Sequence, residues 1–371
     1  MTASPVIGIV GLGTMGLGIA QVYAAAGYPV LATDAQPDAR ETAVARLAAG
    51  LGPLVDKGRM TPTARDAILS KITIVTAAQD MGACTLVIEA IVERMAAKQA
   101  LFSVLEAAVA PDAVLASNTS SLSVALIAAG LNHPDRVLGL HFFNPAPVMK
   151  LVELVPHAGT ATAALQAARL CTETAGKTVV MAPDRPGFIV NRCARPFYGE
   201  ALALLEEGVS AQRIDAAMMA AGYRLGPFAL IDLIGADINL AATEGLLAAM
   251  NGHPRYHVFA ALRDQVRRGD LGRKTGRGFL FPQTVAPAAD PMISDRIDAM
   301  LVNEALWLLS EGGTSRPEID TAMKLGLNFP AGPFEILDRM GADKVCGLLD
   351  RLAATAPAGL APRYTPAPGL N

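Results

Sequence analysis

Short apolar runs alternate with longer amphipathic segments over the first half of the chain. Runs that predict strands occupy residues 5–10, 29–34, 72–75, 86–89, 114–116, 137–143, 149–155 and 177–181. Between most of them, apolar positions recur every three or four residues, which predicts helices. Strands that alternate with helices usually form a parallel sheet that is covered on both faces. We therefore expect an α/β fold that begins with a Rossmann-type, doubly wound sheet.

After residue 187 the strand signal stops, and the spacing predicts an all-α C-terminal region with an internal repeat. A series of short motifs occurs twice in the same order over about 50 residues, which indicates a duplicated helical unit. The first copy contains Glu200-Ala201-Leu202, Glu207-Gly208, Ile214-Asp215, Ala217-Met218 and Gly226-Pro227-Phe228; the second contains Glu304-Ala305-Leu306, Glu311-Gly312, Ile319-Asp320, Ala322-Met323 and Gly332-Pro333-Phe334. We find no counterpart of the FIVNR run (residues 188–192) in the second copy, and expect that copy to be structural.

These patterns divide the chain into four segments. Residues 1–184 are expected to form the sheet domain, 185–282 a helical domain for substrate binding and dimerisation, 292–354 the non-catalytic repeat, and 355–371 a flexible tail rich in Pro and Ala. Within the first segment, residues 37–70 are long for a simple crossover. They predict a helical arm with a break at residues 50–53 and a polar tip at 56–59.

Composition narrows the class of protein. The 371 residues can bury more than one core, and the net charge of −3 without a basic cluster argues against a nucleic-acid partner. No run of 18 or more uncharged apolar residues predicts a membrane span. The N-terminus lacks a signal-peptide pattern, so we expect a cytoplasmic protein. The four Cys and five His residues have no metal-ligand spacing, and we expect no metal site.

The first strand is followed by a G-x-G-x-x-G motif, a helix, and a second strand that ends in Asp34. The motif consists of Gly11, Leu12, Gly13, Thr14, Met15 and Gly16. Gly11 permits the tight turn, Gly13 lets the backbone approach a pyrophosphate, and Gly16 lets helix and strand pack closely. Asp34 can accept a hydrogen bond from a ribose 2′-hydroxyl and would repel a 2′-phosphate. We therefore favour NAD over NADP; FAD is a further dinucleotide option that the later residues do not support.

Polar residues also follow later strands, where open α/β sheets bind their ligands. One strand ends at Glu89, with Glu93 and Lys98 close behind. Another is followed by Ser-Asn-Thr-Ser-Ser at residues 117–121, which either caps the next helix or supplies hydrogen-bond donors at the edge of the sheet. Residues 271–279, LGRKTGRGF, form either a surface turn or a phosphate contact.

The stretch 137–155, VLGLHFFNPAPVMKLVELV, predicts two adjacent strands joined by a tight connection that contains two prolines. This connection brings His141 and Glu153 toward each other. A carboxylate behind an imidazole fixes its tautomer and stabilises its cation, so the pair forms a poised general base. The alternative is a His at a strand end with an unrelated Glu.

Together, the motifs GLGTMG, VIEAIVE, SNTSSL, GLHFFNPAPVMKLVE, PGFIVNR and GRKTGRGF resemble those of the L-3-hydroxyacyl-CoA dehydrogenase family, which includes 3-hydroxybutyryl-CoA dehydrogenases. The resemblance covers roughly residues 5–282, and the repeat extends it to about residue 354. It implies an NAD-dependent enzyme of fatty-acid metabolism and β-oxidation with an acyl-CoA substrate. Single-repeat members of the family dimerise through the helical domain, and we expect a homodimer here too. The duplicated unit is similar to that of longer bacterial members, including those that act on 3-hydroxyadipyl-CoA.

The resemblance also assigns roles to individual residues. His141 is implied as the catalytic base and Glu153 as the group that orients it. Substrate contacts through the reacting oxygen are implied for Ser120 and Asn191. The implied NAD contacts are Glu93, Lys98, Ser120, Asn144 and Lys274, and the implied coenzyme A contact is Lys57. Where the family has a CoA-contacting serine, this chain has Gly50.

The chemistry of alcohol oxidation fits these residues. NAD takes the hydride, His141 takes the proton, and Ser120 with Asn191 holds the oxygen in place. Since Asn191 belongs to the helical region, we expect the site at the seam between domains, with closure on binding. Two alternatives stay open: a dehydrogenase of a free hydroxy or sugar acid, as in relatives resembling lambda-crystallin, and a non-catalytic protein that keeps the fold.

Overall fold

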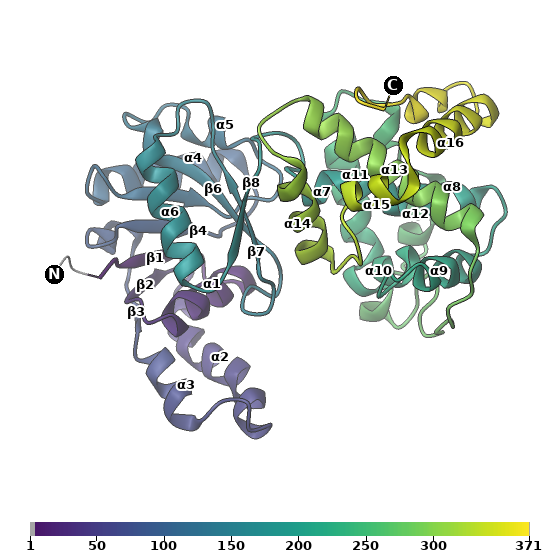
Figure 1. Cartoon of the computed structure of the whole chain (residues 1–371). Coiled ribbons are helices and arrows are strands. Elements are labelled where there is room, and N and C mark those ends of the chain that lie inside the picture. The colour runs from purple at the N-terminus through teal and green to yellow at the C-terminus, as the bar shows by residue number, and fades with distance from the viewer. Residues whose placement is uncertain (1–3, 371) are drawn as a thin grey trace. The chain divides into compact units, whose positions relative to one another are not determined.

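The computed structural model describes residues 4–370, which divide into two compact units (Figure 1). The first unit ends at Arg185 and the second begins at Pro186, one residue beyond the expected boundary. In the described part of the chain, no helix combines the length and apolar character that crossing a membrane requires.

The first unit is built on an eight-stranded sheet in the order β3-β2-β1-β4-β5-β6-β7-β8. Strands β1 to β6 run parallel, β7 is antiparallel to β6, and β8 is parallel to β7. This order confirms the predicted Rossmann-type sheet. The strands are β1 Ile7–Val10, β2 Val30–Thr33, β3 Ile72–Ile74, β4 Leu86–Glu89, β5 Val114–Ser117, β6 Val137–Phe142, β7 Leu151–Val155 and β8 Thr178–Met181.

Helices cover both faces of the sheet, so β1 and β4 to β7 are buried at every residue. One face packs its alternate strand residues, such as Ile9, Ile88 and Leu140, against α1, α2 and α6. The opposite face packs against α4 and α5, and this face also carries the polar strand-end residues described below. The helices of this unit are α1 Thr14–Ala25, α2 Pro37–Asp56, α3 Pro62–Leu69, α4 Met95–Ala108, α5 Val124–Ala128 and α6 Thr162–Thr174, with short 3-10 turns η1 Ala78–Met81 and η2 Pro134–Arg136.

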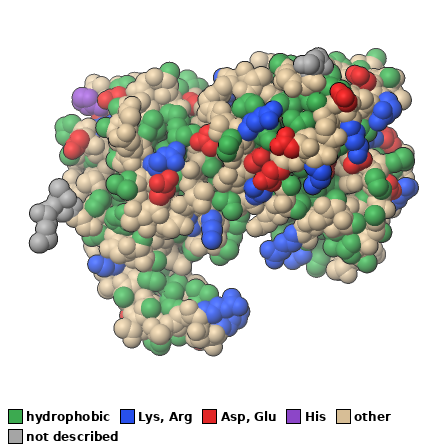
Figure 2. All heavy atoms as spheres, in the orientation of Figure 1, with side chains coloured by type: hydrophobic (Ala, Val, Ile, Leu, Met, Phe, Trp, Pro, Cys, Tyr) green, Lys and Arg blue, Asp and Glu red, His purple; other side chains and the backbone are tan. Residues whose placement is uncertain are grey.

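Helices α2 and α3 extend beyond the sheet edge as the predicted arm (Figure 1). The expected break at residues 50–53 was wrong, because α2 continues through Pro53 and ends only at Asp56. A Cβ atom at Gly50 or Gly52 would meet no neighbour, whereas Leu51 between them is fully buried, so this part of the helix packs on one side only. Figure 2 shows Lys and Arg side chains at the end of the arm, over the exposed turn that contains Lys57 and Arg59.

The second unit is helical, as predicted. Pro196 lies in the first turn of α8, where its missing N–H costs no hydrogen bond, and the chain bends between α7 and α8. The helices are α7 Val190–Cys193, α8 Arg195–Glu206, α9 Ala211–Ala220, α10 Pro227–Ile234, α11 Ala236–Ala249, α12 Ala260–Arg267, α13 Pro291–Ser310, α14 Arg316–Leu327, α15 Pro333–Met340 and α16 Ala342–Thr355, with 3-10 turns η3 Pro254–Tyr256, η4 Arg273–Thr275 and η5 Ala361–Tyr364.

Each repeat uses an aspartate to cap the third of its helices. Asp215 in α9 accepts hydrogen bonds from the backbone N–H groups of Phe228 and Ala229, at 2.9 and 2.8 Å, at the start of α10. Asp320 in α14 accepts one from Phe334, at 2.8 Å, at the start of α15. A Cβ atom at Gly226 would lie 2.2 Å from Asp215 Cγ. The shared Asp and Gly-Pro-Phe motifs are therefore two halves of one capping device.

Each repeat contributes a buried arginine that forms ion pairs with two glutamates of the other repeat. Arg192 binds the carboxylates of Glu304 (2.7 Å) and Glu311 (2.6 Å) in the second copy. Arg296 binds Glu200 (2.9 Å) and Glu207 (2.7 Å) in the first. Each arginine lies eight residues before the first glutamate of its own copy. Residues 292–296 are thus the counterpart of residues 188–192, and the expectation that the second copy lacks this run was wrong. Only its Ile and Arg are shared, and Asp295 stands where the first copy has Asn191.

The chain after residue 355 packs into the second unit, so the expected flexible tail was wrong. Arg363 is 1% exposed and donates from Nε to Glu200 at 2.7 Å. Tyr364 and Ala367 are also buried, and Ala367 N–H donates to Asn303 Oδ1 at 2.8 Å. A Pro/Ala-rich composition predicted flexibility, but buried polar contacts fix the segment.

Candidate active site

The glycine-rich turn after β1 has the geometry of a dinucleotide site. Gly11 has a φ of 103°, and a Cβ there would lie 2.4 Å from the carbonyl oxygen of Ala90. A Cβ at Gly16 would lie 1.7 Å from the carbonyl oxygen of Gly11, so helix α1 can approach the turn only with glycine. A Cβ at Gly13 would meet nothing within 4 Å. The space beside Gly13 is open to a ligand, while Gly11 and Gly16 shape the turn.

The start of α1 suits a pyrophosphate. Its N-cap residue, Gly13, has no side-chain capping bond, and its first turn has no acidic residue. Uncapped N–H groups at a helix N-terminus attract anions. Asp34, at the end of β2, accepts hydrogen bonds from the backbone N–H groups of Leu12 (2.7 Å) and Gln36 (2.9 Å). Asp34 therefore holds the turn in shape and places a carboxylate beside it, where a ribose hydroxyl could donate.

Polar side chains at the ends of β4 and β5 form a buried ion-pair network. Glu89 and Ser117 are register partners, and Ser117 Oγ donates to Glu89 at 2.6 Å. Lys98, from α4, donates to the same carboxylate at 2.6 Å and lies 3.1 Å from Glu93. Lys98 is 1% exposed. The predicted contact of Lys98 with NAD stays a prediction. In this structure the ammonium group is buried and pairs with Glu89 and Glu93.

Glu93 organises the Ser-Asn-Thr-Ser-Ser segment. Its carboxylate accepts hydrogen bonds from Thr119 Oγ1 (2.5 Å), the Ser120 N–H (3.0 Å) and Ser121 Oγ (3.0 Å). Burial alone would raise the pKa of Glu93, but Lys98 and these hydrogen bonds together lower it. The segment does not cap the next helix, because Ser123 is the N-cap of α5. The carboxylate instead fixes the backbone at Ser120, a predicted substrate contact.

His141 and Glu153 pair as the sequence predicted. They are register partners on β6 and β7, and His141 Nδ1 lies 2.6 Å from Glu153 Oε2. Glu153 is fully buried and His141 is 6% exposed. The carboxylate favours the tautomer with its proton on Nδ1, which makes Nε2 the basic nitrogen. The ring of Phe143 lies 4.5 Å from the imidazole ring, centroid to centroid, and supports it.

Asn118 joins the two strand ends and was missed as a site residue. Its Oδ1 accepts a hydrogen bond from the Phe142 N–H at 2.8 Å, and its own N–H donates to the Glu89 carbonyl at 2.8 Å. These bonds tie β4, β5 and β6 together beside His141. Asn118 lies within the polar run that the sequence identified, but spacing alone does not distinguish a brace from a ligand contact.

The other predicted residues lie apart from this cluster or in the second unit. Asn144 is exposed in the β6–β7 connection, and Lys57 is exposed at the end of the arm. Asn191 lies in α7, and Lys274 forms an ion pair with Asp237 at 2.5 Å. The ligand contacts of these four residues stay predictions. Within residues 4–370, no group of His, Cys, Asp and Glu side chains could hold a metal ion.

Comparisons with known families agree with this geometry. The model of the 3-hydroxyacyl-CoA dehydrogenase NAD-binding domain matches residues 6–185, and the model of the family's C-terminal domain matches residues 187–281 and 292–370. The chain belongs to the 3-hydroxyacyl-CoA dehydrogenase family. It is an NAD-dependent oxidoreductase, and the open space at Gly13 and the uncapped start of α1 fit that cofactor.

Two relatives illustrate the range of the family. The chain is 34% identical to 3-hydroxyadipyl-CoA dehydrogenase of Escherichia coli K12, with 93% of each chain covered. It is 40% identical to the probable 3-hydroxybutyryl-CoA dehydrogenase of Bacillus subtilis, over 73% of this chain and 95% of the relative. A crystal structure of 3-hydroxybutyryl-CoA dehydrogenase from Escherichia coli K12 has a TM-score of 0.92 at 32% identity, with 99% and 98% coverage.

Proposed function

We propose that this enzyme oxidises a short-chain L-3-hydroxyacyl-CoA to the 3-oxoacyl-CoA, and catalyses the reverse reduction, with 3-hydroxybutyryl-CoA or 3-hydroxyadipyl-CoA as substrate. The observation that carries the proposal is the buried 2.6 Å contact between His141 Nδ1 and Glu153. A histidine held in this way beside a dinucleotide site has the form of a general base.

The reaction requires a proton to leave the substrate hydroxyl and a hydride to leave its carbon. Nε2 of His141 accepts the proton, and Glu153 stabilises the imidazolium that results. When bound, NAD supplies the hydride acceptor, which no protein side chain can provide. Ser120 and Asn191 donate hydrogen bonds to the oxygen, which holds the substrate in a reactive orientation.

The helical arm is the reason for proposing that the substrate is a coenzyme A ester. Lys57 and Arg59 are exposed in the turn that follows α2. Figure 2 shows Lys and Arg side chains at the end of the arm, where cations suit a phosphate group. A dehydrogenase of free hydroxy acids has no need for such a cationic extension. The arm therefore favours a CoA ester over a free acid.

The test is the consumption of NADH with acetoacetyl-CoA, 3-oxoadipyl-CoA and a free 3-oxo acid as alternative substrates. We expect turnover of at least one CoA ester and none of the free acid. Turnover of the free acid alone would overturn the proposal in favour of a hydroxy- or sugar-acid dehydrogenase. Binding of NADH without turnover of any substrate would indicate a non-catalytic member of the family.

A further inference from the structure

Asn118 lies between β4 and β6, at the point where β5 ends. It directly follows Ser117, the last residue of β5, which pairs in register with Glu89 at the end of β4. On the other side, its Oδ1 accepts a hydrogen bond from the Phe142 N–H at 2.8 Å, and Phe142 directly follows His141 on β6. Asn118 therefore belongs to the carboxyl edge of the sheet, beside the strand that carries the proposed base.

The hydrogen bond to Phe142 fixes the direction in which the Asn118 side chain faces. A backbone N–H can only donate, so the amide oxygen must make this contact and the amide nitrogen, Nδ2, must point the other way. Within residues 4–370, Nδ2 has no hydrogen-bond partner, and the protein does not enclose it. The side chain therefore presents N–H donors in a fixed direction to a ligand at this edge of the sheet.

The neighbours of Asn118 in the chain have already used their side-chain donors. Ser117 Oγ donates to the fully buried Glu89 at 2.6 Å, and Thr119 Oγ1 donates to Glu93 at 2.5 Å. A hydroxyl group has a single proton, so neither residue can donate to a ligand as well. Of residues 117–119, all within the described chain, only Asn118 keeps side-chain donors for a ligand.

The layout of the dinucleotide site directs the nicotinamide ring to this strand end. Asp34, at the end of β2, suits the adenosine ribose, and the open space at Gly13 with the uncapped start of α1 suits the pyrophosphate. The line from β2 through β1 continues across the sheet to β4, β5 and β6. The hydride and the proton leave adjacent atoms of the substrate, so the ring that accepts the hydride must lie beside His141 on β6.

We propose that Asn118 donates a hydrogen bond from Nδ2 to the carboxamide oxygen of the nicotinamide ring. The carboxamide is bonded to the ring carbon next to the one that accepts the hydride, so it is the hydrogen-bonding group of the cofactor nearest to the reacting atoms. A donor that holds this group fixes the rotation of the ring and hence the face that meets the substrate. The inference rests on the proposed function, because that function places the ring beside His141.

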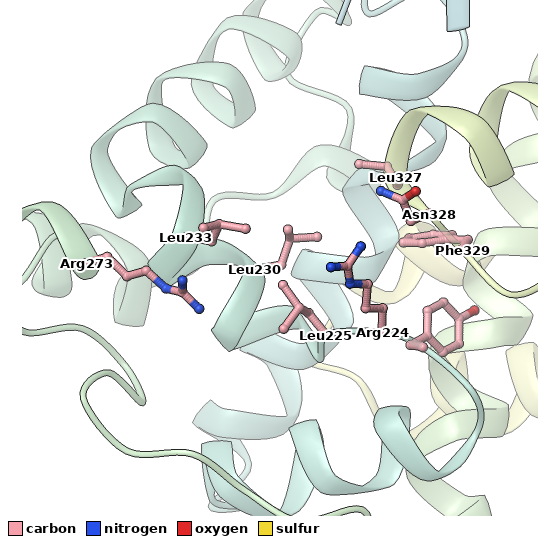
Figure 3. Close-up of a pocket in the computed structure, with 9 residues that line it drawn as sticks. Arg224, Leu225, Leu230, Leu233, Arg273, Leu327, Asn328 and Phe329 are labelled. Atoms are coloured by element: carbon pink, nitrogen blue, oxygen red, sulfur yellow. The ribbon is translucent and has the colours of Figure 1, made fainter. Parts of the chain in front are cut away.

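A pocket in the second unit presents cations to a bound anion and provides a control. It has a volume of about 430 Å³, and Figure 3 shows leucine side chains between the guanidinium groups of Arg224 and Arg273. Guanidinium groups attract the phosphates of any nucleotide. The contact proposed for Asn118 depends on the nicotinamide ring instead, so the two kinds of binding can be separated with nucleotides that have or lack the ring.

The test measures, by titration calorimetry, the dissociation constants of ADP, NADH and reduced 3-acetylpyridine adenine dinucleotide for the wild type and Asn118→Asp. The substituted carboxylate still accepts from the Phe142 N–H but cannot donate. The acetyl group of the analogue keeps the carbonyl oxygen and has no N–H group, so two acceptors would face each other. We expect the analogue to bind about 10-fold more weakly to the variant. NADH should lose less affinity, because its carboxamide can rotate and donate. ADP, which has no nicotinamide ring, should bind unchanged and shows that the variant is folded.

Two further variants are the controls. Arg224→Ala, and Asn251→Asp at an exposed asparagine of the second unit, should leave all three constants unchanged. Unchanged binding of the analogue by Asn118→Asp would overturn the inference. An equal loss for ADP would also overturn it, since Asn118 would then act only as a brace between strands. An equal loss of the analogue in Arg224→Ala would assign its binding to the pocket, with the same consequence.

These binding constants separate the inference from the proposed function. If the wild type reduces a CoA ester and the analogue binds equally well to Asn118→Asp, the cofactor contact is wrong and the proposed function stands. If the wild type reduces no CoA ester and the analogue still binds about 10-fold more weakly to the variant, the proposed function is wrong and the cofactor contact stands.

Discussion

Partners on neighbouring strands and helices determine how individual polar side chains of the first unit are oriented and buried. His141 has its orienting carboxylate directly across an antiparallel ladder, so a two-residue contact depends on the register of β6 and β7. This pair was predictable, because a short connection with two prolines permits few arrangements of its flanking strands. The burial of Lys98 was not predictable, because the spacing of residues in α4 does not reveal that Glu89 and Glu93 lie beside the lysine.

Replacing His141 by Ala should reduce kcat by about 10²–10⁴-fold, the typical contribution of a general base. The affinity for NADH should stay unchanged, because the glycine-rich turn and Asp34 lie on other strands. Steady-state kinetics and NADH fluorescence titration measure the two quantities. Glu153→Gln should give a smaller loss of kcat, since an amide can still accept from Nδ1. A parallel loss of NADH affinity would contradict the role of His141.

Replacing Lys98 by Met should destabilise the first unit by about 3–5 kcal/mol, because two carboxylates would lose their buried counter-charge. Urea unfolding followed by circular dichroism gives the free energy of unfolding. Lys71→Met, at an exposed lysine, is the control and should change it little. A second substitution, Glu89→Gln, should recover part of the loss. A variant as stable as the wild type would show that Lys98 is not a structural ion-pair partner.

Helices in the second unit are organised by motifs that recur once per repeat. The sequence identified the motifs from their order, but their cause is visible only in three dimensions. In each repeat an aspartate caps a helix that begins 12 or 13 residues later, and a glycine leaves room for its side chain. The counterpart of the Asn191 run escaped notice because only its Ile and Arg recur. Arg192 and Arg296 matter because each pairs with a glutamate of the other copy, and residue spacing alone cannot show such a contact.

The capping aspartate of the first repeat should make stability depend on pH. Burial raises the pKa of Asp215 to about 7, above its value in the unfolded chain. The protonated form is thus favoured in the fold, and this stabilisation is complete below about pH 4 and lost as the pH rises through 7. Between pH 6 and 8 the free energy of unfolding should fall by about 1–2 kcal/mol through this group.

Asp215→Asn should remove that dependence. Trp307 is the sole tryptophan and lies in α13, so its fluorescence reports on the second unit during denaturant unfolding. Asp264→Asn, at a residue outside the capping device, should behave as the wild type does. If the asparagine variant and the wild type lose the same stability between pH 6 and 8, another group is responsible.

The second unit as a whole is held by an alternating set of arginines and glutamates. Glu200 receives Arg296 from the second repeat and Arg363 from the segment that follows it. Here the second copy covers a face of the first. The composition of the last segment gave no sign of this role, because one arginine among prolines and alanines does not reveal a buried partner 163 residues away.

Replacing Arg363 by Met should destabilise the second unit by about 3–5 kcal/mol, since it removes one of two cations from the fully buried Glu200. Denaturant unfolding monitored by Trp307 fluorescence is the measurement, and Thr365, which follows Arg363 in this segment, contacts the indole through its carbonyl oxygen at 3.4 Å. Arg351→Met, at an exposed arginine, is the control. Equal stability of both variants would show that the segment contributes little.

The partners of Glu200 also impose an order of events on the growing chain. On the ribosome, α8 emerges about 100 residues before Arg296 and 163 residues before Arg363. Until both have been synthesised, the first repeat carries a glutamate that it cannot bury without counter-charge. The second unit therefore completes its fold late in synthesis, whereas the sheet of the first unit has all its strands by residue 181. In this enzyme, the nucleotide-binding unit can therefore fold before Arg363, which the helical unit needs to complete its fold, has been synthesised.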